Sequence, residues 1–393
     1  MNKEIHTSEV QEYIREHQHT DVHQLAMARS PFPGISAQEL AAQIAARKKS
    51  ARKLPSWHSA EGIYYPPLLS VEQCSSEITA AYKAELTTGG RLIDLTGGFG
   101  VDSFYFSKVN ESVTHCEINE ELSAIASYNA PLLGQENTSF LAADGIEHLK
   151  NSAEQFSTIY IDPARRSSAG KVFMLKDCSP DVVDNLDLLL AHTDCLLIKT
   201  APLLDISAGL KELRNVAAIH VLSVKNECKE LIWLLEKDFH GTAQIICTTL
   251  NSSRKEFSFL MGEETATSQM AIPAAGKYLY EPDVALLKGG AFNLIAERYQ
   301  LKKIHPQTQL YISDVINETF PGRIFRIDNI LSAADLKKAK NLTGSVIVRN
   351  YPEKAAALVE KYHIRPDDHQ FLIFAQAESS GKIILKSTIL QHY

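Results

Sequence analysis

Four carboxylate side chains lie at positions where they could bind a ligand together. Asp94, Glu117, Asp144 and Asp162 each follow a short apolar run, and these runs predict strands over residues 92–93, 112–116, 138–142 and 157–161. A single acid at the end of a strand usually caps the next helix. Four acids in this position indicate the carboxyl edge of a parallel sheet, which is where open α/β sheets bind their ligands.

A glycine-rich turn follows the first of these acids. Gly97, Gly98 and Gly100 separate the first strand from an amphipathic segment that begins at Val101, an order that predicts strand, tight loop and helix. Glycine lets the backbone turn sharply and lets a ligand approach it closely. The loop amides would lie at the positive end of the helix, which favours an anionic or polar ligand group. Glu117 follows at slightly more than the ~20 residues at which an acid binds ribose in nucleotide-binding sheets.

The composition of the chain favours some classes of protein and argues against others. The chain has 393 residues, a hydrophobic content of 45% and a charged content of 22%, which are ordinary values for a folded protein of two or three domains. The polar N-terminus and the absence of a long apolar run predict neither a signal peptide nor a membrane span. Six scattered cysteines without a CxxC pair predict reduced thiols in the cytoplasm and no metal site. The net charge of −7 argues mildly against a nucleic-acid-coated protein but permits a local basic face.

The chain is expected to fold in three parts. Residues 1–69 predict a helical segment, residues 70–264 a doubly wound, Rossmann-like α/β sheet with right-handed crossovers, and residues 277–393 a smaller α+β module. A linker rich in small residues spans 265–277. In the α+β module, strands are predicted at 309–312, 324–327, 344–349, 371–376 and 382–385, and helices at 333–340 and 352–362.

Several local predictions bear on the site. Ser70 is expected to cap one helix that continues to residue 86, with Gln73, Ser75 and Ser76 either lining the ligand site or only capping backbone. Asn226-Glu227 is either a turn or a substrate-side carboxylate. The runs at 228–237, 243–250 and 256–261 predict antiparallel strands that close the edge of the sheet. Residues 278–304 are expected to form a helix and its connections.

The sheet resembles a class I S-adenosylmethionine-dependent methyltransferase. The string DLTGGFG at residues 94–100 is similar to the first motif of that family, with Thr96 where many members have the first glycine. The resemblance implies S-adenosylmethionine as the cofactor, with Gly98 and Gly100 near its methionine part, Glu117 on the ribose hydroxyls and Asp144 on the adenine amine. The cofactor set that the resemblance implies is completed by Asp94, Thr96, Gly97, Ile118 and Gly145.

The whole chain also resembles a group of predicted methyltransferases with a C-terminal THUMP-like, or ferredoxin-like, domain. The strings that carry this likeness are LSVEQCSSEITA, DLTGGFGVDS, DPARR, KNECKEL, YLYEPDVALLKGGAF and VIVRNYP. Because THUMP-like modules are associated with RNA binding, the resemblance implies a tRNA or rRNA substrate.

The string Asp162-Pro163-Ala164-Arg165 occupies the place of the family's catalytic motif. Asp162 could hold an amine or hydroxyl beside the methyl group, and Pro163 would direct backbone carbonyls at it. Arg165 stands where an aromatic residue stacks on the base in amine methyltransferases, and a guanidinium can stack or bind phosphate. Arg165 and Arg166 could instead pair with acids at the sheet edge. Residues 199–202, Lys-Thr-Ala-Pro, lack the cysteine that pyrimidine C5 methylation needs.

Three classes of function remain open from the sequence. An RNA methyltransferase is favoured by the C-terminal resemblance. A methyltransferase that acts on a small molecule or a protein is favoured by the acidic charge balance. A non-catalytic RNA-binding scaffold is disfavoured by the intact Gly98, Gly100, Glu117 and Asp162.

Overall fold

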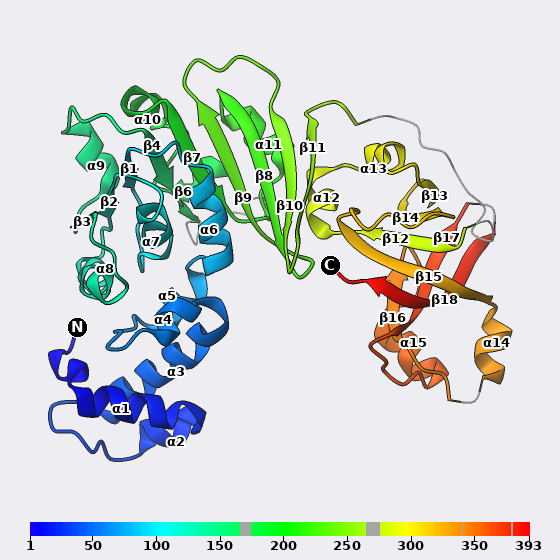
Figure 1. Ribbon diagram of the computed structural model, residues 1–393, viewed down its shortest axis with the longest axis horizontal. Helices are drawn as coiled ribbons and strands as arrows, with labels where there is room; N and C mark the ends of the chain where they lie inside the picture. Colours follow the sequence, from blue (N-terminus) through cyan, green and yellow to red (C-terminus); the bar gives the residue numbers. More distant parts are fainter. Residues whose placement is uncertain (166–173, 265–275, 340, 379) are drawn as a thin grey trace. The chain divides into compact units, whose positions relative to one another are not determined.

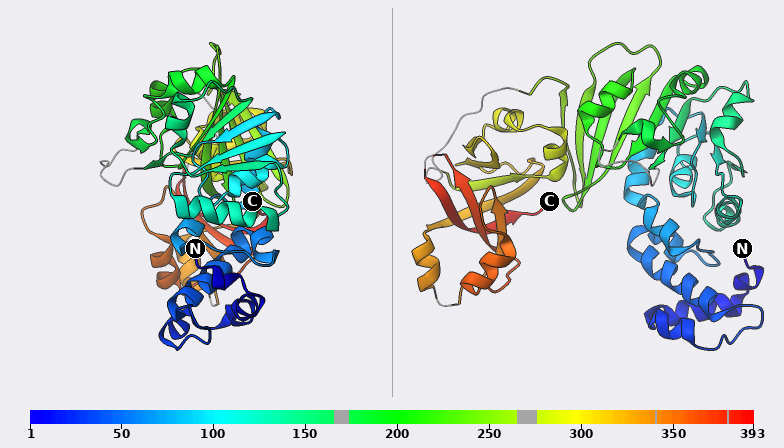
Figure 2. Two further views of the ribbon diagram at one scale, coloured as in Figure 1. Left: turned by 90° about the vertical axis from the view of Figure 1, so that its left-hand side faces the viewer. Right: turned by 180° about the vertical axis from the view of Figure 1, so that it is seen from behind.

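The computed structural model describes residues 1–165, 174–264, 276–339, 341–378 and 380–393. The chain divides into two compact units, one made of residues 1–218 and 230–241 and the other of residues 219–229 and 242–393. Figures 1 and 2 show both units from three directions. None of the helices in the described ranges is both long and apolar enough to cross a membrane. The predicted linker lies mostly outside the described residues, as does Arg166.

The first unit contains the predicted parallel sheet. Its strands are β1 (Arg91–Asp94), β2 (Ser112–Cys116), β3 (Thr138–Leu141), β4 (Thr158–Ile161) and β7 (Cys195–Thr200). The pairs β1–β2, β1–β4, β2–β3 and β4–β7 are all parallel. The crossover helices are α7 (Val101–Ser107), α8 (Glu120–Leu132), α9 (Gly145–Lys150), α10 (Leu186–His192) and α11 (Ile206–Glu212). This arrangement confirms the predicted doubly wound α/β fold and brings the carboxyl ends of the five strands to one edge.

Antiparallel strands complete the nine-stranded sheet, whose order is β11-β10-β8-β9-β7-β4-β1-β2-β3. The added strands are β8 (Val216–Val224), β9 (Glu227–Glu236), β10 (Gln244–Leu250) and β11 (Arg254–Leu260). The prediction that all the later strands close the edge was wrong for β9, which lies between β7 and β8 and pairs antiparallel with β7. The cause is a tight turn at Lys225 and Asn226, both of which have left-handed backbone angles (φ 51° and 57°) and fold the chain directly back.

Asn226 belongs to this turn rather than to a substrate site. Its side-chain Oδ1 accepts a hydrogen bond of 2.8 Å from the backbone N–H of Val284, the first residue of α12 (Val284–Gly289). The neighbouring Glu227 is exposed and pairs with Lys229 at 2.6 Å. Of the two alternatives, the structure supports the turn.

The N-terminal residues form helices α1 (Ser8–Glu16), α2 (Val22–Met27), α3 (Ala37–Lys53), α4 (Pro55–Ser59), α5 (Leu68–Gln73) and α6 (Glu77–Glu85). The predicted capping box of Ser36 and Glu39 starts α3. The prediction of one continuous helix from Ser70 to residue 86 was wrong, because the chain is extended at Cys74 and a new helix begins at Glu77. Ser76 caps this helix by accepting a hydrogen bond from the backbone N–H of Thr79. Two 3₁₀ turns, Lys3–His6 and His17–His19, complete this region.

An aromatic cluster joins these helices to the glycine turn. Trp57 on α4 is 1% exposed, and its ring lies 6.0 Å from Phe99 of the turn and 4.9 Å, edge to face, from Phe104 of α7. The same core includes Tyr65 and Ile125. The N-terminal helices therefore support the glycine turn from one side.

Besides most of β8 and all of β10 and β11, the second unit holds an α+β module around a seven-stranded sheet of order β13-β14-β12-β15-β18-β17-β16. Its strands are β12 (Tyr278–Pro282), β13 (Lys302–His305), β14 (Thr308–Ser313), β15 (Gly322–Leu331), β16 (Ser345–Arg349), β17 (Gln370–Ala377) and β18 (Gly381–Gln391). Besides α12, its helices are α13 (Asn293–Arg298), α14 (Ala333–Lys338) and α15 (Ala355–Tyr362). The five strands predicted here are confirmed, but residues 278–282 were wrongly expected to belong to a helix and its connections. They form an interior strand buried on both faces. Such a strand lacks the alternation of polar and apolar residues that identifies a half-exposed strand in a sequence.

We expect Trp57→Ala to lower the free energy of unfolding by about 3–5 kcal/mol, the range for deleting a large buried aromatic ring. Urea denaturation of the full chain measures this change. Ser59→Ala on the same helix is the matched control, because Ser59 is exposed. Equal stability of the two variants would show that the Trp57 ring contributes nothing to this core.

Candidate functional site

A cavity of about 650 Å³ opens at the carboxyl edge of the parallel strands, a size within the ~300–1,000 Å³ of small-molecule sites. Ten of the twelve residues predicted from sequence line it. They are Thr96, Gly97, Gly98, Glu117, Ile118, Asp144, Gly145, Asp162, Pro163 and Arg165. Asp94 and Gly100 do not line it; they lie beneath the glycine turn and at the start of α7.

Close packing and left-handed backbone angles disfavour side chains at the glycines of the turn. A Cβ atom on Gly97 would lie 2.2 Å from the ring of His115, and burial lowers the pKa of that histidine to about 4. Gly98 and Gly100 have φ angles of 55° and 85°, in the left-handed region that favours glycine. Gly98 donates its backbone N–H to Oε2 of Glu117 at 2.9 Å. The turn is thus held on the second strand by packing and by a hydrogen bond.

The two acids after β2 and β3 are oriented by backbone amides. Glu117 also accepts a hydrogen bond from the N–H of Asn119 at 2.8 Å, which leaves further lone pairs on both carboxylate oxygens. Asp144 accepts hydrogen bonds from the N–H groups of Ile146 and Glu147 and starts α9. Exposed Ile118 adds an apolar surface to the cavity. These side chains could bind the hydroxyls, amine and flat face of a nucleoside.

Asp94 braces the turn from below. It is fully buried, and its carboxylate accepts hydrogen bonds from the N–H of Thr96 at 3.1 Å and from the hydroxyl of Ser103 at 2.7 Å. Burial raises the pKa of Asp94 to about 7. Its role in the structure is to hold the first strand, the turn and α7 together.

Asp162 forms an ion pair that the sequence did not reveal. The Nζ atom of Lys199, on β7, lies 2.7 Å from Oδ2 of Asp162, and both side chains reach the cavity. Burial raises the pKa of Asp162, and the Lys199 charge opposes that rise. The Asp162 backbone N–H donates to the hydroxyl of Thr96 at 2.7 Å. Arg165 lies exposed in the short strand β5 (Ala164–Arg165), which pairs with β6 (Cys178–Ser179).

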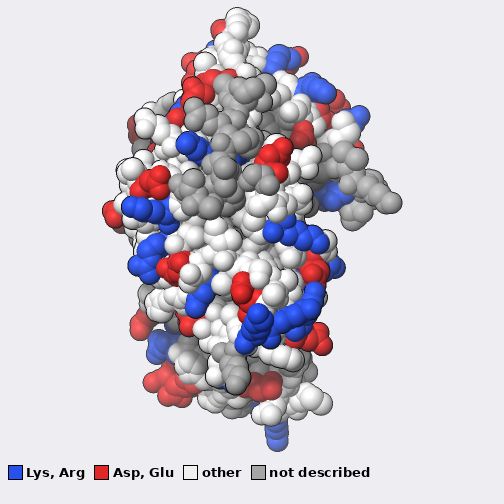
Figure 3. All heavy atoms as spheres, turned by 90° about the vertical axis from the view of Figure 1, so that its right-hand side faces the viewer, with Lys and Arg blue, Asp and Glu red and all other residues white. Residues whose placement is uncertain are grey.

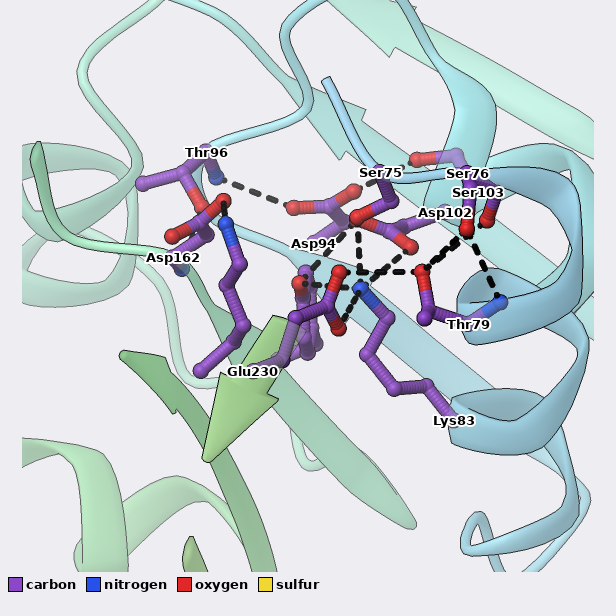
Figure 4. Close-up of polar contacts among 12 residues, drawn as sticks. Ser75, Ser76, Thr79, Lys83, Asp94, Thr96, Asp102, Ser103, Asp162 and Glu230 are labelled. Carbon is purple, nitrogen blue, oxygen red and sulfur yellow. Dashed lines mark hydrogen bonds and ion pairs between the residues drawn. The ribbon is translucent and has the colours of Figure 1, made fainter. Parts of the chain in front are cut away.

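A buried lysine lies beneath this edge of the cavity (Figure 4). The side chain of Lys83, on α6, is 0% exposed and lies between Asp102 at 2.8 Å and Glu230 at 2.9 Å. Burial opposes the charge on Lys83, but these two carboxylates raise its pKa above the ordinary value. Ser75, which lines the cavity, accepts from Lys83 at 2.6 Å and donates to Asp102 at 2.8 Å. Sequence analysis missed this network; the one signal was a lysine within the alanine-rich segment of α6.

One cysteine lines the cavity, at a position that the sequence analysis did not consider. Cys74 follows α5, and its thiol donates to the carbonyl of Val71 at 3.2 Å. Burial raises the pKa of this thiol to about 11. A thiolate is the nucleophilic form of cysteine, so the site disfavours attack on a pyrimidine ring by Cys74.

Comparison with known proteins agrees with this geometry. The crystal structure of a provisionally assigned methyltransferase from Porphyromonas gingivalis W83 superposes over 99% of both chains with a TM-score of 0.88 and 28% identity. An uncharacterised S-adenosylmethionine-dependent methyltransferase of Mycobacterium tuberculosis is 23% identical over 71% of this chain and 76% of its own length. The chain is an S-adenosylmethionine-dependent methyltransferase.

Two further likenesses are local. A family model described as a ferredoxin-like domain matches residues 278–321 of the methyltransferase, which run from β12 to the residue before β15. An uncharacterised RNA methyltransferase of Mycoplasma mobile is 33% identical over 75 residues, which is 19% of this chain and 21% of that protein. The family match is to a ferredoxin-like domain, and the THUMP-like character expected from sequence is not confirmed.

The residues present fit the cofactor. S-Adenosylmethionine supplies a methyl group on a positively charged sulfur. The methyltransferase offers a turn without side chains at Gly97 and Gly98, oriented carboxylates at Glu117 and Asp144, and a partly buried carboxylate at Asp162. No group of three His, Cys, Asp or Glu side chains suited to a metal ion occurs in the described part of the chain.

We expect Asp94→Asn to flatten the pH dependence of stability. The pKa of Asp94 in the folded protein is about 7, which is above its unfolded value of ~3.9. The protonated carboxyl therefore contributes its full share to the free energy of unfolding below pH 4, and this contribution is lost as the pH rises to 7. The variant should therefore gain stability relative to the wild type over this window, on the order of 1 kcal/mol per pH unit at most.

Urea denaturation at pH 4, 5.5 and 7 measures the difference. Asp184→Asn is the matched control, since Asp184 is exposed. A constant difference between Asp94→Asn and the wild type across this range would contradict the account of Asp94.

Proposed function

We propose that the methyltransferase acts on RNA, most directly on a base of tRNA or rRNA. The observation that carries this proposal is the placement of Arg165 beside Asp162 at the cavity. A guanidinium there can stack on a base or bind a phosphate, both of which RNA presents.

The distribution of charge supports this proposal. Residues 277–393 hold 16 Lys and Arg against 12 Asp and Glu, whereas residues 1–276 hold 24 against 35. Lys and Arg side chains gather on part of the face of the second unit in Figure 3. A local excess of positive charge is what binding to phosphates requires. The RNA methyltransferase of Mycoplasma mobile, similar over 75 residues, favours the same class of substrate.

The cofactor residues take the following roles in the proposal. Glu117 binds the ribose hydroxyls, Asp144 the adenine amine, and Ile118 the flat face of adenine. The backbone at Gly98 accommodates the methionine part, and Thr96, Gly97 and Gly145 line the same wall of the cavity. Gly100 and Asp94 act from outside the cavity, where Gly100 starts α7 and Asp94 braces the turn. Asp162 positions the target atom, Pro163 aims the neighbouring carbonyls, and Arg165 binds base or phosphate.

A second candidate substrate is a small molecule or a protein. The overall charge of −7 favours it, because a net negative protein repels the phosphate backbone at long range.

We expect Glu117→Ala and Asp162→Asn to separate binding from transfer. The Glu117→Ala variant loses charge-assisted hydrogen bonds to the cofactor that are worth about 1.5–3 kcal/mol. Its affinity for S-adenosylmethionine, measured by calorimetry, should therefore fall roughly tenfold to a hundredfold. Asp162→Asn should keep the affinity within a few-fold and abolish methyl transfer. Glu120→Ala, at an exposed neighbouring position, is the control; full transfer by Asp162→Asn would remove Asp162 from the reaction.

The class of substrate is tested with radiolabelled S-adenosylmethionine. RNA, protein and metabolite fractions from cells lacking the methyltransferase are incubated separately with the purified enzyme. Label in the RNA fraction is the expected result. Label confined to protein or metabolites would contradict the RNA proposal and support the second candidate.

A further inference from the structure

Asp162 and Lys199 together present a hydrogen-bond acceptor and a donor to the cavity. The side chain of Asp162 is 30% exposed and that of Lys199 is 15% exposed. Of the two carboxylate oxygens of Asp162, only Oδ2 is hydrogen bonded within the described part of the chain, and Asp162 is there the only hydrogen-bond partner of the Lys199 ammonium. An ammonium has three N–H donors and an ionised carboxylate only accepts. Both groups therefore retain capacity for a substrate.

The charge of Lys199 is balanced by Asp162 only while that carboxyl is ionised. Lys83 is buried between Asp102 and Glu230, and the partly buried Lys199 pairs with Asp162. Lys53 adds a further ammonium nearby, which donates to the carbonyl of Val71 at 3.0 Å and interacts with the charge of Glu230. A proton accepted by Asp162 removes the negative charge beside Lys199, and in a poorly hydrated site the uncompensated ammonium attracts an anion.

We propose that the site methylates a ring nitrogen that carries a proton and adjoins a carbonyl group, as N1 of guanine and N3 of uracil do. Asp162 accepts the proton of this N–H, and Lys199 donates to the adjoining carbonyl oxygen. This inference rests on the proposed RNA function and names the target atom within it.

The chemistry of such a nitrogen requires both groups. Its lone pair is delocalised into the carbonyl, so it becomes nucleophilic only as the N–H proton leaves. That proton passes to Oδ1 of Asp162, and the negative charge gathers on the carbonyl oxygen beside Lys199. The nitrogen then forms a bond to the methyl carbon, while the bond between that carbon and sulfur breaks and its electron pair stays on sulfur. The proton later passes from Asp162 to water.

An exocyclic amine fits the same pair less well. The amino groups of adenine and cytosine also adjoin an acceptor, a ring nitrogen, so hydrogen bonding alone does not separate the two classes. Their methylation, however, develops no negative charge on that neighbour, and the buried ammonium of Lys199 would have nothing to stabilise. The cation therefore favours the carbonyl-flanked nitrogen.

The experiment uses the full-length enzyme, radiolabelled S-adenosylmethionine and RNA from a strain that lacks the protein. The product is digested to nucleosides and analysed by mass spectrometry. Label in 1-methylguanosine or 3-methyluridine supports the inference. Label on an amino group of adenosine or cytidine, on a carbon or on a ribose hydroxyl would overturn it while leaving the RNA proposal intact, and no label in RNA would overturn both.

Variants of Lys199 give a second readout. Lys199→Met should lower kcat/KM for RNA on the order of 100-fold, the effect of removing one group that stabilises a developing oxyanion, and leave S-adenosylmethionine affinity within a few-fold. Because Lys199 lowers the pKa of Asp162, its loss should move the acidic limb of the pH profile to higher pH. Lys199→Arg should restore part of the rate and return the limb toward its original pH.

Lys211→Met is the matched control, since Lys211 is exposed on α11. If Lys199→Met lowers the rate but leaves the acidic limb where it is in the wild type, Lys199 has only a structural role and the inference fails.

Discussion

Burial of Lys83 and Lys199 against three carboxylates is the constraint on which the site depends. Removing charged groups from water is costly unless they are paired and hydrogen bonded. The partners come from five elements: α6 supplies Lys83, α7 Asp102, β7 Lys199, β9 Glu230, and the end of β4 Asp162. The charge of Lys83 is therefore satisfied only when α6, α7 and β9 are in place, and that of Lys199 only when β4 and β7 are. This requirement also explains why β9 lies inside the sheet, because a position at the edge would separate Glu230 from Lys83.

The glycine turn depends on a different kind of contact. Its floor is the neutral ring of His115, which fills the space that a side chain on Gly97 would need. Its side is supported by Trp57 from the N-terminal helices through Phe99. Glu117 and Asp94 fix the backbone by hydrogen bonds to Gly98 and Thr96. A turn held in this way has little freedom to adjust, so the cofactor meets a surface whose shape is already set. Helices α1 to α4 consequently contribute to the site without lining the cavity, whereas α5 contributes Ser70 and Gln73 to its wall.

The sequence predicted those features that local patterns determine. Parallel strands, the glycine turn and the carboxylates after β1 to β4 follow from apolar runs and from the residues directly behind them. The features that it did not predict arise from contacts between distant residues. Lys83 resembles a solvent-facing helix residue, and its burial is tolerable because it pairs with Asp102 and with Glu230, which lies 147 residues further along the chain. The position of β9 depends on a two-residue turn, and the break between α5 and α6 on one cap at Ser76. Strand β12 is buried on both faces and so lacks the alternation that identifies half-exposed strands.

A crystal structure of the enzyme with S-adenosylhomocysteine, the product of methyl transfer, would test the central claim most directly. The claim is that cofactor and target share one cavity in which Asp162 and Lys199 face the transferred methyl group. The account predicts the ribose hydroxyls on Glu117, the adenine between Ile118 and Asp144, and the sulfur atom facing Asp162. A sulfur atom facing away from Asp162, or a ribose that does not contact Glu117, would contradict it.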